Sequence, residues 1–322
     1  MDKPLSIFES LPNEIFVDLC EYFDVRELEK IFSNLNYRFN TLLKSLYHLT
    51  LYVQIPDDNL INFNTIFLSQ IYTIKIYSQQ YFDLKLFSNL HRLTIWFPID
   101  EQLLQIQTES FPYLEYLSIS FTISKPSISS LYKKIFSNGF PLLKSCFLYG
   151  RESPLNTIEW TQSPNLQYLH ITSNYSSVLT SCPNLYFLNL TLPNVCNMLI
   201  PLKPHFNLKR LRLILTSIVW LDDEKYFDIL FQSIPTLERL SLHKIFSVTN
   251  SIDLLVNYDW LSKILIHCLP LLKQMIYHLY IFNLFDIDQT DFNENLRKIQ
   301  ENFSKIYENY SDFYLQIKPY NT

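Results

Sequence analysis

The sequence predicts an α/β protein in which three N-terminal helices precede an irregular solenoid of parallel strands and helices. Two observations carry this prediction: a short apolar phrase recurs along most of the chain, and the segment before its first copy has a helical period instead. The chain has 322 residues, 48% hydrophobic and 18% charged, which is enough to bury a large core. Extensive disorder is therefore excluded.

The segment before the repeats has the pattern of three short helices. Pro12 suits the first turn of a helix in which Ile15 and Leu19 share one stripe, and Asp24 with Glu27 forms a capping box for the next helix. A third apolar stripe follows. Three helices within about forty residues cannot bury all of these side chains among themselves, so some must face the solenoid or another protein.

The recurring phrase is roughly Pro-x-Leu-x-x-Leu-x-Leu or Ile. Its clean copies are NLHRLTI (89–95), FPYLEYLSI (111–119), SPNLQYLHI (163–171), CPNLYFLNL (182–190), FNLKRLRL (206–213) and IPTLERLSL (234–242). Degraded copies are SLYHLTL (45–51), QIYTIKI (70–76), FPLLKSCFL (140–148) and LPLLKQMIY (269–277). The alternation at period two predicts a short strand whose leucines point inward and whose intervening residues point outward.

The first apolar anchor of each copy measures the repeat length. These anchors are Leu46, Ile71, Leu90, Leu114, Leu143, Leu166, Leu185, Leu208, Leu237 and Leu272. Their mean step of about 25 residues lies within the range of roughly 20–29 that is typical of leucine-rich repeats. The uneven steps favour variable, intracellular units.

Helix-compatible segments lie between the phrases. They are Asp100–Ser110, Ser127–Asn138, Asp222–Ser233 and Ile252–His267, in which apolar residues return every three or four positions. A strand and a helix in each unit imply a parallel solenoid, and one unit alone cannot bury its apolar edge. Stacked neighbours share a core, so both ends of the array need a cap.

The C-terminal segment suits such a cap. Its apolar residues are spaced as one helix face, opened by a box at Asp291 and Glu294, and they are Phe292, Leu296, Ile299, Phe303, Ile306 and Tyr310. The alternative is an amphipathic helix that binds a partner. Phe313–Ile317 is expected to add an edge strand. The predicted domains are therefore a helical domain at 1–45, the solenoid at 46–285 and the cap helix with its edge strand at 286–322.

Composition argues against several classes of partner and against a secreted or membrane protein. The net charge is −5 with no long basic run, so we expect no nucleic acid and no membrane surface as partner. Five cysteines without a CxxC pair indicate reduced thiols, and the N-terminus does not resemble a secretory signal. Leu269–Phe285 is apolar but interrupted and too short for a bilayer. We expect an intracellular protein of the cytoplasm, the nucleus or both.

No motif indicates chemistry. The two glycines open no phosphate-binding loop, the seven histidines have no zinc-site spacing, and there is no G-x-S-x-G. The densest carboxylate run, Asp222-Asp223-Glu224, is explained by the dipole of a helix that begins there. We therefore expect no catalytic residue, no metal ligand and no cofactor, and an enzyme is the least favoured function.

The N-terminal segment resembles an F-box, in LPNEIFVDLCEYF (11–23), DVRELEKI (24–31) and LNYRF (35–39). It departs from the family at Phe23, where Leu is usual, and at 36–39, where many members carry Cys-Lys/Arg-x-Trp. An F-box followed by leucine-rich repeats resembles the substrate receptors of Skp–cullin–F-box ubiquitin ligases. The resemblance implies a Skp-type adaptor and a cullin scaffold as partners, with adaptor contacts at Leu11, Pro12, Ile15, Leu19 and Leu28. For these five residues a place in the internal core is the alternative.

The strand residues on either side of the second anchor are expected to point outward as one column. From it we select as candidate target-binding residues Arg92, Tyr116, Tyr168, His170, Phe187, Arg210, Arg212 and Arg239. Arginine and tyrosine supply much of the energy of protein interfaces, and Arg210, Arg212 and Arg239 favour an acidic segment. An ordinary solvated strand face is the alternative. The two leading functions are thus a ubiquitin-ligase receptor and a stand-alone leucine-rich-repeat scaffold, and the target protein is unknown.

Overall fold

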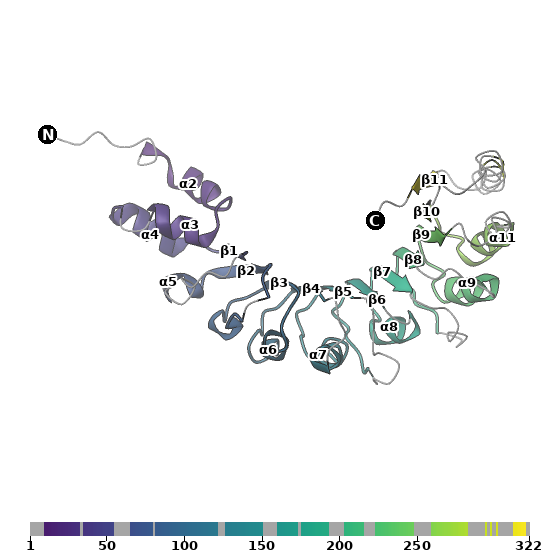
Figure 1. Cartoon of the computed structure of the whole chain (residues 1–322), viewed down its shortest axis with the longest axis horizontal. Helices are drawn as coiled ribbons and strands as arrows, with labels where there is room; N and C mark the ends of the chain where they lie inside the picture. Colours follow the sequence, from purple (N-terminus) through teal and green to yellow (C-terminus); the bar gives the residue numbers. More distant parts are fainter. Residues whose placement is uncertain are drawn as a thin grey trace. The chain divides into compact units, whose positions relative to one another are not determined.

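The computed structural model describes most of the chain. The described residues are 10–32, 35–54, 65–79, 81–121, 126–150, 160–172, 175–192, 203–215, 223–247, 259–282 and 312–319, with the single positions 294, 297 and 301. Two compact units divide the chain: unit 1 comprises residues 1–134 and 139–145, and unit 2 comprises residues 135–138 and 146–322. Each unit is α/β with parallel strands (Figure 1).

Unit 1 begins with three helices in the segment where the sequence predicts three. They are α2 (Asn13–Cys20), α3 (Val25–Phe32) and α4 (Tyr37–Ser45). A small aromatic core joins them: the ring of Phe16 lies 5.0 Å from that of Phe32 and 4.9 Å from that of Phe39. These rings are almost fully buried, so each short helix is held by the other two.

Four parallel strands follow in sequence order in unit 1. They are β1 (Leu49–Val53), β2 (Ile71–Ile76), β3 (Arg92–Trp96) and β4 (Tyr116–Ser120). The connecting segments contain α5 (Thr65–Leu68), the 3-10 turn η2 (Leu84–Leu86), α6 (Asp100–Gln105) and α7 (Pro126–Ile135). Helices α5, α6 and α7 lie on one side of the strands (Figure 1).

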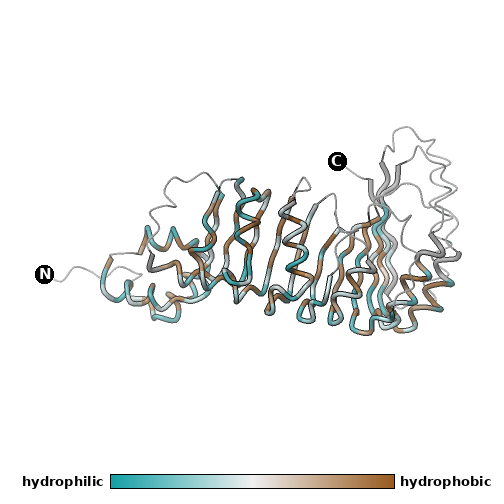
Figure 2. Tube along the Cα trace, turned by 90° about the horizontal axis from the view of Figure 1, so that it is seen from below, coloured by the Kyte–Doolittle hydropathy of each residue, from teal (hydrophilic) through white to brown (hydrophobic). Residues whose placement is uncertain are grey.

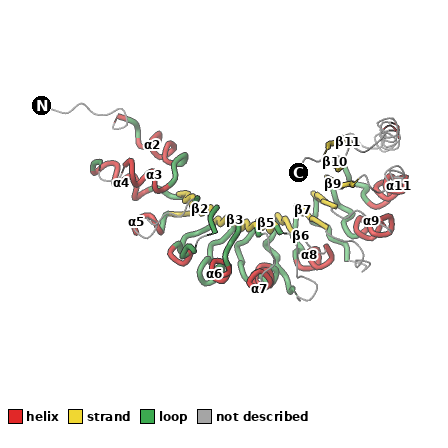
Figure 3. The backbone as a smooth tube through the Cα atoms, in the orientation of Figure 1, coloured by secondary structure: helices red, strands yellow, loops and turns green. Residues whose placement is uncertain are grey.

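Unit 2 repeats this arrangement. Its strands are β5 (Ser145–Tyr149), β6 (Tyr168–Thr172), β7 (Phe187–Leu192), β8 (Arg210–Leu215), β9 (Arg239–Ser247), β10 (Gln274–Phe282) and β11 (Asp312–Pro319). From β6 to β11 each strand pairs in parallel with the next one along the chain. Helices α8 (Tyr175–Ser181), α9 (Asp223–Gln232) and α11 (Asp259–Cys268) lie on one side of these strands (Figure 3).

The core follows the predicted alternation. All ten anchors from Leu46 to Leu272 are buried. In β8 the arginines and Ile214 are half-buried while Leu211, Leu213 and Leu215 are buried, so alternate residues face the helices. Within each unit, successive turns of the chain lie side by side as rungs in which polar and apolar residues alternate (Figure 2). The predicted α/β arrangement with parallel strands is confirmed, but the described connection from β2 to β3 contains the 3-10 turn η2 in place of a helix.

Several helices are shorter than the sequence predicts. Helix α7 ends at Ile135, before the predicted Asn138, because Asn138 adopts a left-handed φ of 57° and the Gly139 N–H bonds back to the Lys134 carbonyl at 2.8 Å. A Cβ on Gly139 would lie 2.6 Å from that oxygen, so the turn requires glycine. Helix α6 ends at Gln105, whose side chain accepts a hydrogen bond from the Leu84 N–H at 2.7 Å.

The sequence predicts an edge strand and a cap helix at the C-terminus, and the described residues include the strand but only part of the helix. Strand β11 extends the sheet edge beside β10, which confirms the expected edge strand. Most of the predicted cap helix, including its six apolar residues, lies outside the described residues. Glu294, Arg297 and Glu301 are described as helical, with an Arg297–Glu301 ion pair at 2.9 Å. Among the described helices, none has the length and apolar character needed to cross a membrane.

Candidate functional site

The helices of unit 1 expose apolar side chains beyond their small core. Of the five residues predicted to contact an adaptor, Pro12 is exposed, Ile15 is 46% exposed and Leu19 is 36% exposed, while Leu11 is half-buried. Leu28 is corrected: it is 0% exposed, because α3 turns this residue inward with Val25 and Phe32. Leu28 therefore belongs to the core and not to an accessible surface.

Four further side chains of this segment are exposed but were missed as candidates. Ile31 and Leu35 are 46% and 56% exposed, and Tyr22 and Tyr37 are 87% and 86% exposed. Ile31 lies three residues after Leu28 on α3, but the buried stripe of this helix consists of Val25, Leu28 and Phe32, and Ile31 lies at its flank. We call Pro12, Ile15, Leu19, Tyr22, Ile31, Leu35 and Tyr37 the helical surface.

Hydrogen bonds hold these helices together and against the sheet of unit 1. Arg38 on α4 donates to Asn13 Oδ1 at 2.8 Å and to the Leu11 carbonyl, which fixes the start of α2. Gln70, just before β2, donates through Nε2 to the carbonyls of Leu43 and Leu46, each at 3.0 Å. Gln70 thus satisfies the free carbonyls at the end of α4, and the helical surface has a defined position within unit 1.

The second candidate surface is the strand face of unit 2 opposite its helices, which we call the open face. In the part of unit 2 that the structure describes, no helix covers it (Figure 1). Strand register arranges its outward residues in three rows. The first row is Tyr168, Phe187, Arg210, Arg239 and Gln274; the second is His170, Asn189, Arg212, Ser241 and Ile276; the third is Thr172, Thr191, Ile214, His243 and His278.

The open face brings together six of the eight predicted target-binding residues. Tyr168, Phe187, Arg210 and Arg239 are neighbours in the first row, and His170 and Arg212 share the second. The remaining two, Arg92 and Tyr116, are register partners in unit 1, where the Arg92 guanidinium lies 4.8 Å from the centre of the Tyr116 ring. The prediction that these positions point outward from their strands is supported.

A shallow hollow adjoins the first row at the amino ends of β6 to β8. Its volume is about 430 Å³, and it is lined by Gln167, Tyr168, Asn184, Tyr186, Asn207 and Lys209. The rings of Tyr168 and Tyr186 are 6.0 Å apart, and the Arg210 guanidinium lies 5.4 Å from the Tyr186 ring centre. Aromatic and cationic groups of this kind favour binding a peptide over catalysing a reaction.

Sequence reasoning missed this hollow although a signal was present. An asparagine precedes the anchor leucine in successive copies of the phrase, as in Asn184 and Asn207. Asn184 donates to the Pro164 carbonyl and Asn207 to the Pro183 carbonyl, both at 2.9 Å. Each asparagine therefore ties its repeat to the previous one and forms part of the wall of the hollow.

The middle of the open face is polar and partly enclosed. Asn189 lies with its Nδ2 3.2 Å from His170 Nδ1, and Ser241 Oγ lies 2.9 Å from His243 Nε2. Burial, and then the charge of Arg212, lowers the pKa of His170 to about 4 and that of His243 to about 3. Both imidazoles are consequently neutral at pH 7, and Arg212 supplies the positive charge between them.

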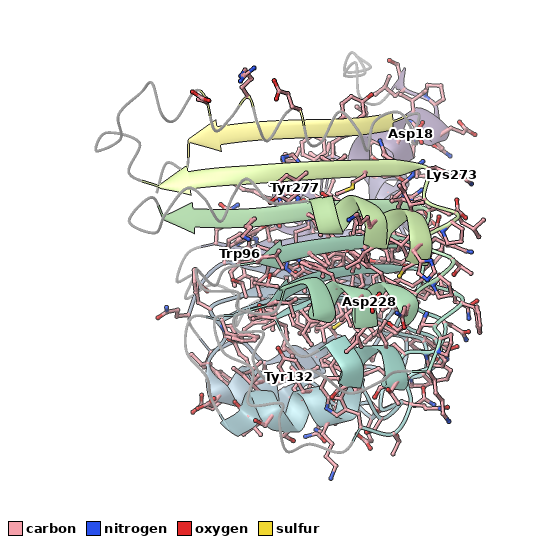
Figure 4. The ribbon with its side chains drawn as sticks, turned by 90° about the vertical axis from the view of Figure 1, so that its right-hand side faces the viewer. Asp18, Trp96, Tyr132, Asp228, Lys273 and Tyr277 are labelled. Atoms are coloured by element: carbon pink, nitrogen blue, oxygen red, sulfur yellow. The ribbon has the colours of Figure 1, made fainter. Side chains whose placement is uncertain are left out.

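Chemistry-bearing groups are scattered over the described part of the chain. No cluster of three or more His, Cys, Asp or Glu side chains suited to a metal ion occurs among the described residues. Cys20, Cys146, Cys182 and Cys268 are buried, and burial raises the pKa of each thiol. Figure 4 shows the positions of Lys273 just before β10, of Tyr277 within β10 and of Asp228 on α9.

No protein-family model matches this chain, and the comparison with curated proteins found no relative.

Proposed function

We propose that the chain is the substrate receptor of a Skp–cullin–F-box ubiquitin ligase. In this proposal the helical surface of unit 1 binds a Skp-type adaptor, which links the chain to a cullin, and the open face of unit 2 binds a target protein. The chain is then intracellular and performs no reaction itself. It raises the effective concentration of the target beside the enzyme that transfers ubiquitin.

One observation carries the proposal: apolar residues of the N-terminal helices remain exposed although their common core is complete. Phe16, Phe32 and Phe39 fill that core, whereas Ile15 and Leu19 are exposed on the same helices. Exposed aliphatic side chains that gather on one small segment are typical of a surface that a partner covers. The F-box resemblance of 11–39 suggests which partner that is.

Capture of a purified Skp-type adaptor tests the proposal. The full chain is expected to retain the adaptor, and the variant I15E/L19E is expected to lose at least about tenfold in affinity, because two buried contacts become charged. The matched control is L86E/L142E, which alters two exposed leucines of unit 1 that lie outside the three N-terminal helices and are 53% and 43% exposed. This control is expected to bind the adaptor like the wild type.

Two outcomes contradict the proposal. If the wild-type chain never retains the adaptor, the stand-alone leucine-rich-repeat scaffold replaces the ligase receptor. If I15E/L19E and L86E/L142E bind equally well, the helical surface is not the adaptor site. Circular dichroism of each variant establishes that the helices and strands are retained, since all four positions are at the surface.

A further inference from the structure

The open face of unit 2 has a charge pattern opposite to that of the chain. The whole sequence holds 31 acidic and 26 basic side chains besides histidine, for a net charge of −5. None of the outward positions in the three rows of β6 to β10 holds Asp or Glu, whereas Arg210, Arg212 and Arg239 occupy three of them. The face is therefore a local cationic surface on an acidic protein.

Arg212 is half-buried in the second row of the open face. Its Nε is buried and has no hydrogen-bond partner among the described residues, and the same holds for Oδ1 of its register neighbour Asn189. A buried guanidinium nitrogen without an acceptor is costly, and a carboxylate is the acceptor that best matches the planar guanidinium. The neighbouring His170 and His243 are neutral at pH 7, so the positive charge at this place comes from Arg212.

The first row divides into an aromatic half and a cationic half. Tyr168 and Phe187 on β6 and β7 form the first, and Arg210 and Arg239 on β8 and β9 form the second. Neighbouring strands are about 4.8 Å apart, so the two halves are separated by about 5 to 15 Å. An extended peptide rises about 3.3 Å per residue, so two to four residues span this separation.

We propose that the open face of unit 2 binds an extended acidic peptide segment, with carboxylates on Arg210, Arg212 and Arg239 and an apolar side chain two to four residues away on Tyr168 and Phe187. The inference rests on the proposed role of the chain as a target receptor and names the chemical class of the target segment. Charge complementarity selects the acidic part, and the two exposed rings select the apolar part.

Selection from a phage library of random 12-residue peptides on the immobilised full chain tests this inference. Enriched peptides are expected to carry at least two Asp or Glu residues and a Leu, Ile, Phe or Met two to four positions from them. Affinity of an enriched peptide, measured by fluorescence anisotropy, is expected to fall at least tenfold in R210Q/R212Q. In the wild-type chain, replacing the apolar residue of the peptide with Gly is expected to weaken binding. In Y168A/F187A the same change in the peptide is expected to have no effect, because the two rings that it contacts are absent.

The control variant is K85Q, which removes an exposed cation of η2 in unit 1 and is expected to leave the affinity unchanged. R239Q serves if R210Q/R212Q is unfolded, because Arg239 is exposed. Absence of enrichment, enrichment of basic peptides, or equal binding of a (dT)12 oligonucleotide with the same arginine dependence would overturn the inference. No adaptor is present in this measurement, so its failure leaves the adaptor experiment standing, and the reverse is also true.

Discussion

The carboxylate of Asp24 binds the backbone of Tyr52, with Oδ2 accepting the Tyr52 N–H at 2.6 Å. The other oxygen of the same carboxylate accepts the Arg26 N–H at 2.8 Å, and Arg26 in turn donates to the Tyr52 carbonyl. Asp24 is therefore both the N-terminal cap of α3 and a link from that helix to β1. The sequence predicts the cap from Asp24 and Glu27, but not the link, because the partner lies 28 residues away.

Loss of this link is expected to loosen the helices of unit 1. Replacing Asp24 with Ala removes a helix cap and leaves the Tyr52 N–H without its acceptor, which together cost about 2 kcal/mol of unfolding free energy. In Asp24→Ala, hydrogen exchange is expected to become faster for the backbone amides of both α3 and β1. Asp24→Asn, which keeps one acceptor oxygen, is expected to lose less.

Asp18→Ala is the matched control, because Asp18 is an exposed acid on α2, and its effect is expected to stay within about 0.5 kcal/mol. Equal exchange rates in the Asp24→Ala chain and the wild type would show that the carboxylate does not hold the junction.

Stability is expected to fall as the pH is lowered from 7.5 to 5. The pKa values of His170 and His243 are about 4 and 3 in the folded chain, below the ordinary value of about 6.5. At a pH between the folded and the ordinary pKa values, the two histidines bind more protons in the unfolded chain than in the folded chain, so lowering the pH favours unfolding. Because both rings are partly screened by solvent, the loss at pH 5 is expected to be about 1 kcal/mol for each histidine.

Urea unfolding at the two pH values measures this loss. The variant H170Q/H243Q is expected to show a smaller difference between pH 7.5 and pH 5, because neither glutamine titrates. Replacing the exposed His267 with Gln is expected to leave the wild-type difference intact. If H170Q/H243Q keeps the full pH dependence of the wild type, then His170 and His243 do not cause the loss of stability in acid.

The buried cysteines are expected to resist alkylation in the native state. Burial raises the pKa of Cys20 to about 11 and that of Cys182 to about 12; for Cys268 burial and then the neighbouring Asp228 raise the pKa to about 11. Since the thiolate is the reactive form, iodoacetamide at pH 8 is expected to modify these thiols at least about a hundredfold more slowly than after unfolding. Peptide mass mapping with and without urea gives the ratio of the two labelling rates. Rapid labelling of Cys182 in the native chain would contradict its buried position.

Much of the fold was accessible from spacing alone, because the period-two phrase assigns each leucine to the core and each intervening residue to the surface. Register then followed, as Tyr168, Phe187 and Arg210 show by lying in one row. Helix ends were less accessible: Asn138 ends α7 through a left-handed backbone that spacing does not reveal. The mistaken placement of Leu28 has a similar cause, since the sequence indicates a stripe but not how wide a face its neighbours can cover.

The alternation of side chains within each strand separates the residues that form the core from the residues that form the open face. Leu211 and Leu213, which pack in the core, lie on one side of β8, whereas the half-buried Arg210 and Arg212 lie on the other side. A substitution at an exposed outward position such as Tyr168 or Arg239 therefore alters the surface while leaving the apolar core unchanged. In the proposed receptor, the exposed residues of single strands can therefore change the preference for a target while the apolar scaffold is kept.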